Sequence, residues 1–167
     1  MMRFLVSMSM LSLLSIGAIF GFFYAWVCST MWGLNAADPR VAIRAMQAMN
    51  ASVRNPVFFP AFFLTPVVLA ATGLVAFLND RKHSALLLAA AAALYIAGAF
   101  LVTATVNVPM NEALALVVAP SDAETAARIW QEYSTPWQFW NLIRTVVSGV
   151  CLILTGFALL ALNPKTG

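Results

Sequence analysis

Four long apolar segments constrain this chain more than any other feature of its sequence. They cover about residues 4–28, 56–78, 84–106 and 137–162. Because an α-helix rises about 1.5 Å per residue, roughly 20 apolar residues cross a hydrocarbon core of about 30 Å. The sequence therefore predicts four membrane-spanning helices.

The composition supports this interpretation. Of the 167 residues, 62% are hydrophobic and only 9% are charged, which is more apolar surface than a soluble domain of this size can bury. The net charge of +3 comes from basic residues scattered between the apolar segments, so no continuous basic patch for nucleic acid is expected. We predict one integral membrane domain over residues 1–167, with the lipid bilayer as its main partner and homo-oligomerisation left open.

The connections between the segments predict how the helices are arranged. The stretch "NDRKH" is short, so the second and third helices must be antiparallel neighbours. The small residues of "LLLAAAAALYIAGA" in the third segment suit close helix packing. The predicted fold is all-α: an integral membrane four-helix bundle, with short interfacial helices in the first and third connections.

Each of the two longer connections carries helix signals. In the first, Asp38 suits an N-cap and Pro39 the first helical position, and an amphipathic pattern follows. In the second, Pro109 is expected to end the third spanning helix. A further helix is expected after Ser121 or Asp122, either of which suits its N-cap.

With four spans, both long connections lie on one side of the membrane, and both termini lie on the other side with the short loop. The basic residues that set orientation are evenly divided between the two sides. They are Arg3, Arg81, Lys82 and Lys165 on the terminal side, and Arg40, Arg44, Arg54 and Arg128 in the long connections. We expect a bacterial inner membrane location with both termini in the cytoplasm.

A cation lies inside the last apolar segment. Arg144 follows Trp137 by seven residues, which places it roughly 10 Å along the helix. Trp137, Asn141 and Arg144 are spaced i, i+4 and i+7, and Trp140 precedes Arg144 by four, so they share one broad face. A charge at that depth costs about 2.5–3.5 kcal/mol on insertion scales, which favours an inward orientation with polar partners.

Several polar side chains of the long connections are expected at the same end of the bundle. They are Gln47, Asn50, Asn107, Asn111 and Glu112. Together with Arg144 and the two tryptophans, they predict a pocket with mostly apolar walls and a few directed polar groups.

Structural roles are the alternative for these residues. Arg144 would then extend to the membrane surface or pair with Glu112 or Glu132, and the tryptophans would belong to an interfacial aromatic belt. The asparagines would cap helix ends next to Pro109.

No resident metal or cofactor is expected. The single histidine, His83, lies in the short loop on the opposite side, so no set of facing histidines could hold a haem. Cys28 and Cys151 are isolated and form no C-x-x-C pair. The sequence contains no zinc-type cluster and no glycine-rich nucleotide-binding loop.

Four motifs carry a resemblance to a known family. In order, "AMQAMN", "RNPVFFPAFF", "NVPMNEAL" and "WQFWNLIRTVVSG" are similar to the small four-span membrane proteins that include the anthrone oxygenases. The similarity covers almost the whole chain. The matching positions are Met46, Gln47 and Asn50; Asn107, Pro109 and Asn111; and Trp137, Trp140, Asn141 and Arg144.

The resemblance implies a cofactor-free oxidation of a hydrophobic aromatic molecule, of anthrone or phenol type, with dioxygen as co-substrate. The residues expected to act in catalysis are Arg144, Asn141 and Glu112. Those expected to bind the substrate are Trp137, Trp140, Asn107, Asn111, Gln47 and Asn50. Two other functions stay open: a non-catalytic module that binds a quinone or lipid, and a structural subunit of a membrane complex.

Overall fold

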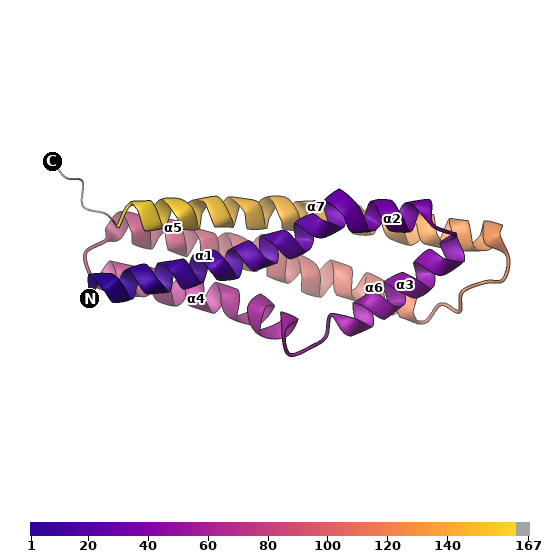
Figure 1. Ribbon diagram of the computed structural model, residues 1–167, viewed down its shortest axis with the longest axis horizontal. Helices are drawn as coiled ribbons and strands as arrows, with labels where there is room; N and C mark the ends of the chain where they lie inside the picture. The colour runs from indigo at the N-terminus through magenta and orange to yellow at the C-terminus, as the bar shows by residue number, and fades with distance from the viewer. Residues whose placement is uncertain (163–167) are drawn as a thin grey trace.

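The computed structural model describes residues 1–162, so Lys165 lies outside the described residues. Within that part of the chain every regular element is helical, and the helices form one elongated bundle (Figure 1). Four helical rods are long and apolar enough to cross a membrane: Met2–Ala36, Phe58–Leu78, Lys82–Ala115 and Ala123–Leu160. The predicted four-helix membrane bundle is therefore confirmed.

Two of the rods contain wider, π-helical turns. The first rod consists of α1 (Met2–Ala25), η1 (Trp26–Thr30) and α2 (Met31–Ala36). The third consists of α5 (Lys82–Tyr95), η2 (Ile96–Phe100), η3 (Thr103–Asn107) and α6 (Val108–Ala115). The second rod is α4 (Phe58–Leu78), the fourth is α7 (Ala123–Leu160), and α3 (Pro39–Ser52) lies in the first connection.

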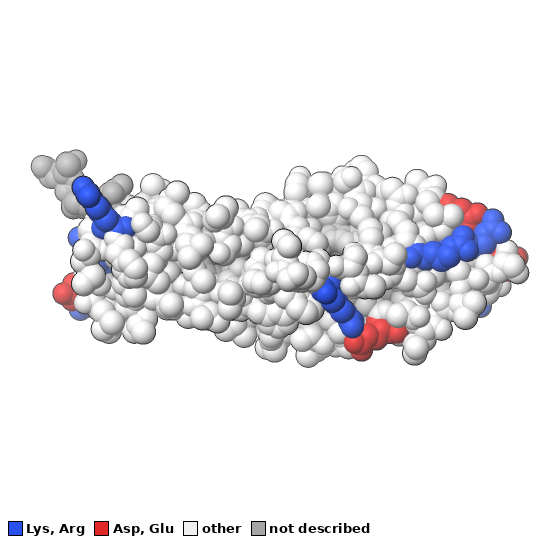
Figure 2. Space-filling model, turned by 60° about the horizontal axis from the view of Figure 1, so that its bottom comes forward, with Lys and Arg blue, Asp and Glu red and all other residues white. Residues whose placement is uncertain are grey.

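Helix α4 indicates the thickness of the apolar layer. Its 21 residues lie between Arg54 and Asp80 and span about 32 Å, close to a bilayer's hydrocarbon core. Figure 2 shows a broad uncharged band on one face, between the charged side chains at one end of the molecule and those scattered over its other half.

The long connections meet at one end of the bundle. The α4–α5 turn, the start of α1 and the end of α7 lie at the opposite end (Figure 1). The helices pack closely enough that glycine is required at Gly98 in η2, where a Cβ atom would lie 2.8 Å from a methyl group of Val147 in α7. The same-side arrangement predicted for the two long connections is confirmed.

The third connection differs from the prediction, because it holds no separate interfacial helix. Asp122, and not Ser121, caps a helix that runs without interruption through Pro136 into the last span. Pro136 is exposed, so the carbonyl group freed by its ring lies on the outer face of α7 and can be solvated. The fourth helix therefore begins 14 residues before the predicted start at residue 137, at Ala123.

Pro109 does not end the third rod either. The helix continues through it as α6, and the wide turn η3 lies directly before it. A π-helical turn has a larger radius than an α-helical turn, which relieves the clash between the proline ring and the preceding turn.

Helix α3 begins as predicted, with Asp38 as N-cap and Pro39 in its first turn. Its apolar face is buried within the bundle: Ala42, Ile43 and Met46 belong to a second hydrophobic core that includes Trp130 and other residues of α7. This core, beyond the main membrane core, fixes the end of the bundle where the long connections meet.

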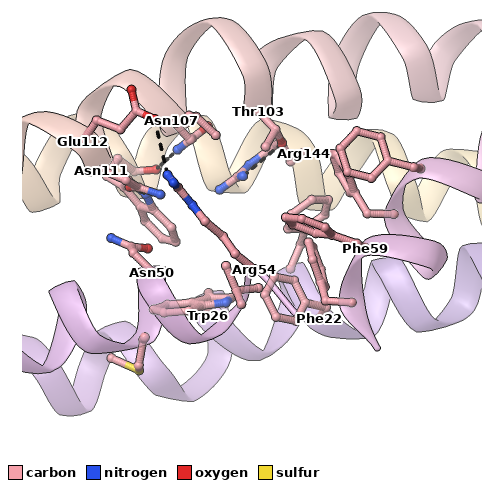
Figure 3. Close-up of a pocket in the computed structure, with 18 residues that line it drawn as sticks. Phe22, Trp26, Asn50, Arg54, Phe59, Thr103, Asn107, Asn111, Glu112 and Arg144 are labelled. Atoms are coloured by element: carbon pink, nitrogen blue, oxygen red, sulfur yellow. Dashed lines mark hydrogen bonds and ion pairs between the residues drawn. The ribbon is translucent and has the colours of Figure 1, made fainter. Parts of the chain in front are cut away.

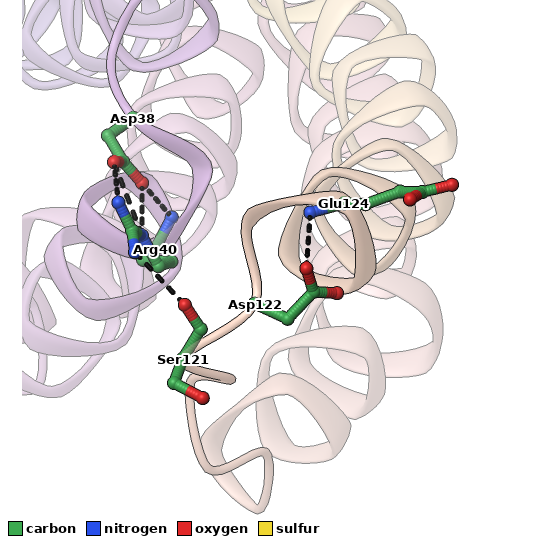
Figure 4. Close-up of polar contacts among 5 residues, drawn as sticks. All are labelled: Asp38, Arg40, Ser121, Asp122 and Glu124. Carbon is green, nitrogen blue, oxygen red and sulfur yellow. Dashed lines mark hydrogen bonds and ion pairs between the residues drawn. The ribbon is translucent and has the colours of Figure 1, made fainter.

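A polar clamp joins the starts of α3 and α7 (Figure 4). Arg40 pairs with Asp38 at 2.6 Å, and its Nη1 donates to the carbonyl oxygen of Ser121 at 3.0 Å. Hydrogen bonds from Arg40 lower the pKa of Asp38 to about 2. Asp122 accepts hydrogen bonds from two backbone N–H groups of the first turn of α7, at 2.8 and 3.4 Å.

Candidate active site

A cavity of about 350 Å³ lies between α1, η1, the α3–α4 junction, η3, α6 and α7 (Figure 3). This volume is within the range of small-molecule sites. Eight of the 18 residues that line it are aromatic. The aromatic residues that line it are Phe22, Phe23, Trp26, Phe58, Phe59, Phe62, Phe63 and Trp137.

Arg144 is the deepest charged group of the cavity wall. Its side chain is only 4% exposed, and it lies about 24 Å from the end of α7 at Leu160, inside a hydrocarbon core of about 30 Å. Its Nη1 donates to Thr103 Oγ1 at 3.1 Å and its Nη2 to Asn141 Oδ1 at 3.0 Å. The guanidinium also lies over the rings of Phe23 and Trp137, 4.6 and 5.3 Å from their centroids.

No carboxylate among the described residues pairs with Arg144. Glu112 pairs with Arg54 at 3.3 Å, and Glu132 pairs with Arg128 at 3.4 Å. The alternatives of an internal ion pair or a side chain extended to the membrane surface are therefore both wrong. Arg144 points inward and leaves a positive charge beside the cavity.

Two buried polar atoms of the cavity residues have no hydrogen-bond partner among residues 1–162. They are Nε of Arg144, a donor, and Oδ1 of Asn107, an acceptor. Asn107 is 1% exposed, and its Nδ2 donates only weakly to the carbonyl oxygen of Trp137, at 3.5 Å. Since an unpaired buried polar group costs about 1–3 kcal/mol, a ligand that bonds to these atoms would recover free energy.

A hydrogen-bond network joins polar side chains of α3, α6 and α7 next to the cavity. Asn50 in α3 donates to the hydroxyl of Tyr133 at 3.3 Å, and that hydroxyl donates to Asn111 Oδ1 at 2.8 Å. Trp137 Nε1 donates to the same oxygen at 2.9 Å. Because Asn111 Oδ1 accepts twice, its amide orientation is fixed, and its NH₂ group takes no part in these bonds.

An exposed ion pair lies at the mouth of the cavity. The long side chain of Arg54 crosses from the α3–α4 junction toward Glu112 on α6 (Figure 3). The two side chains are 53% and 61% exposed, so the ion pair lies at the surface of the protein.

The structure brings six of the nine predicted site residues to the cavity wall. They are Arg144, Glu112, Trp137, Asn107, Asn111 and Asn50. Asn141 lies directly behind the wall, where it accepts from Arg144 and donates to the carbonyl oxygen of Phe23 at 3.1 Å.

The remaining two lie elsewhere. Gln47 donates to the carbonyl oxygens of Leu114 and Val117, both at 2.8 Å, and so ties α3 to the end of α6. Trp140 contacts Phe139 edge-on at 5.4 Å and does not line the cavity.

The prediction missed the phenylalanines of α1 and α4, together with Thr103 and Tyr133. The signal for the phenylalanines was present, because "FGFFYAW" and "VFFPAFF" place aromatic residues four apart on single helix faces. Thr103 and Tyr133 gave no signal, since threonine and tyrosine are common in helices of any function.

The cavity offers few metal ligands. Among the described residues no three His, Cys, Asp or Glu side chains lie close enough together to hold a metal ion, and Glu112 is the one such residue in the cavity wall. Cys28 is exposed and Cys151 is buried, and neither is in a disulfide.

Comparison with known families gives one match. The model of the family described as anthrone oxygenase matches residues 54–154. The matched range contains Arg144, Asn107, Asn111 and Glu112, whereas Asn50 and the rest of α3 precede it. Comparisons with curated proteins and with solved structures found no match.

Proposed function

The chain belongs to the anthrone oxygenase family, and from this premise we propose that it oxidises a hydrophobic aromatic molecule of anthrone or phenol type with dioxygen. The observation that carries the proposal is the buried guanidinium of Arg144, which faces an aromatic-walled cavity and has no carboxylate partner among the described residues. Such a group suits a ligand that becomes an anion during the reaction.

The chemistry needs an anion and dioxygen. An anthrone has a CH₂ group opposite its ketone, and loss of one proton gives an enolate whose charge is shared with the ketone oxygen. Dioxygen then forms a bond to the former CH₂ carbon and, with one proton, gives a hydroperoxide. Breaking the O–O bond with loss of the second C–H proton releases water and leaves a second carbonyl, so anthrone and O₂ become anthraquinone and H₂O.

Arg144 would stabilise the enolate. A preformed charge in a site that excludes water stabilises a developing anion far more than the same charge in water does. Its Nη1 and Nη2 each donate one hydrogen bond, to Thr103 and Asn141, so each keeps a second N–H group, and its buried Nε has no partner. In this proposal Asn141 is a positioning residue that holds the guanidinium in place.

The other polar groups have separate proposed roles. Asn111 and Asn107 would bind oxygen or hydroxyl groups of the substrate, Asn50 would hold Asn111 in place through Tyr133, and Trp137 would pack on the flat rings. Glu112 is the carboxylate of the cavity wall and would accept the proton of the CH₂ group, directly or through water.

Gln47 and Trp140 receive no role in substrate binding, because neither lines the cavity. We propose no resident cofactor. The expected location remains the bacterial inner membrane, with both termini in the cytoplasm.

The test is oxygen uptake by the purified protein in liposomes that contain anthrone, with anthraquinone followed by absorbance. Uptake of one O₂ per anthraquinone formed, above the rate of protein-free liposomes, supports the oxygenase. Thermal stabilisation by anthraquinone without oxygen uptake would instead favour a quinone-binding module. A partner protein that co-purifies in fixed ratio and covers Arg54 and Glu112 would favour a structural subunit.

A further inference from the structure

A second hollow, here called the groove, lies on the outside of the bundle next to the cavity. It has a volume of about 440 Å³ and runs between α1, the end of α3 and the start of α4. Five residues line both the groove and the cavity: Phe22, Trp26, Met49, Val53 and Phe58. The two hollows are therefore separated by side chains of these shared residues.

Two of the shared residues form a pair of aromatic rings in contact. Phe22 on α1 and Phe58 at the start of α4 lie with their ring centroids 4.5 Å apart. Both side chains are half-buried, and each borders the cavity on one side and the groove on the other. A rotation of either ring, without movement of a helix, would widen the passage between the hollows.

The groove opens outward where the apolar layer begins. Ala18 and Val57 in its wall are exposed, Val57 to 82%. Helix α4 begins at Phe58, four residues after Arg54, and groove residues lie both before and after this start, so the groove lies at the boundary between the charged end and the apolar layer. Flat aromatic molecules with a polar edge concentrate at this depth, as tryptophan and tyrosine side chains do.

We infer that the groove between α1 and the start of α4 is the entrance through which the aromatic substrate passes from the bilayer into the cavity, with Phe22 and Phe58 as its gate. The inference rests on the proposed function for the identity of the substrate. The other opening, beside Arg54 and Glu112, is charged and exposed, which suits protons and water better than a fused-ring hydrocarbon.

An obstruction in the groove tests the entrance. Ala18→Phe adds a ring to an exposed residue that lines the groove but not the cavity. Ala71→Phe is the matched control, because Ala71 is exposed on α4 and lines neither hollow. Binding of anthrone from liposomes is followed without oxygen, by stopped-flow quenching of tryptophan fluorescence, so that no turnover occurs.

The entrance predicts a specific kinetic pattern. Ala18→Phe should slow both association and dissociation of anthrone about tenfold and leave Kd unchanged, because an obstructed passage affects both directions equally. Ala71→Phe should behave as the wild type. Ala61→Phe, which narrows the same groove from α4, should repeat the pattern if Ala18→Phe does not fold.

The outcomes distinguish the proposed entrance from the proposed oxygenase activity. Unchanged rates in the groove variants, with anthrone bound by the wild type, would overturn the entrance and leave the oxygenase standing. Slowed binding by the groove variants, together with no oxygen consumption by the wild type, would support the entrance and rule out the oxygenase. A wild-type protein that binds no anthrone would overturn both.

Discussion

Replacement of Arg144 by methionine separates the proposed catalytic role of this residue from a structural one. Arg144→Met removes the guanidinium but keeps a long, flexible side chain in a site that is 4% exposed. It also removes hydrogen bonds to Thr103 and Asn141 and contacts with the rings of Phe23 and Trp137.

The effects on stability have opposite signs. Each lost hydrogen bond from a charged donor costs about 1.5–3 kcal/mol, and each lost cation–π contact costs about 0.5–2 kcal/mol. Against this, the variant no longer has to hold a charge in the apolar layer, which relieves about 2.5–3.5 kcal/mol, and methionine fills most of the space. Together these effects leave a net loss of about 0.5–7.5 kcal/mol, and we expect the folded, membrane-inserted state to survive it.

The effect of Arg144→Met on the reaction is a lower rate. Removal of a preformed donor to a developing oxyanion typically lowers kcat by about 10²–10³. We therefore expect oxygen uptake with anthrone in liposomes to fall by about that factor. Arg144→Lys should lose less, because it keeps the charge but not the planar guanidinium.

The matched control is Arg128→Met on the same helix. Arg128 is exposed and pairs with Glu132 one turn away, so its replacement should cost about 0.3–0.5 kcal/mol and leave oxygen uptake unchanged. Wild-type activity in a folded Arg144→Met protein would refute the role of the guanidinium. An equal loss in both variants would show that the assay reports a general effect of removing charge from α7.

Three further predictions concern other parts of the molecule. Trp137→Phe keeps an aromatic ring but removes the donor to Asn111, so the free energy of unfolding in a detergent titration should fall by about 1 kcal/mol; no change would mean that water replaces the bond. Glu112→Gln should lower the rate of oxygen uptake by about 10²-fold or more and leave anthraquinone affinity unchanged, whereas retained turnover would point to water as the proton acceptor. The depressed pKa of Asp38, about 2, means that its ionised form stabilises the fold above the unfolded pKa near 3.8 and that this contribution is lost as pH falls toward 2. Asp38→Asn keeps the cap but not the pair with Arg40, so its melting temperature should lie below the wild type above pH 4 and converge with it near pH 2; a gap that persists at pH 2 would contradict this origin.

Much of the fold could be predicted because the membrane imposes few choices. Apolar segments of sufficient length must be helices, and the short "NDRKH" stretch forces α4 and α5 to be neighbours. Four spans then place both long connections at one end. The helix boundaries could not be predicted, because a proline usually interrupts a helix. Here the π-helical turn before Pro109 and the exposed position of Pro136 allow both helices to continue.

The site was predictable where a residue was out of place for its surroundings. Arg144 in the fourth apolar segment and Asn107 at the end of the third both stood out, and both line the cavity. Gln47 was predicted from its place in the first long connection, but it donates to carbonyl oxygens at the end of α6, a role that sequence spacing does not distinguish from ligand binding. The aromatic walls were harder to recognise, because phenylalanine is ordinary in a membrane helix until the packing shows that several rings surround one space.

The most direct test of the account is an experimental structure of the protein in a lipid environment with anthraquinone bound. We expect a flat ligand between the aromatic walls, with one oxygen within about 3 Å of a nitrogen of the Arg144 guanidinium and its rings against Trp137. A cavity filled by a lipid chain while anthraquinone binds elsewhere, or a guanidinium turned toward the membrane surface, would contradict it.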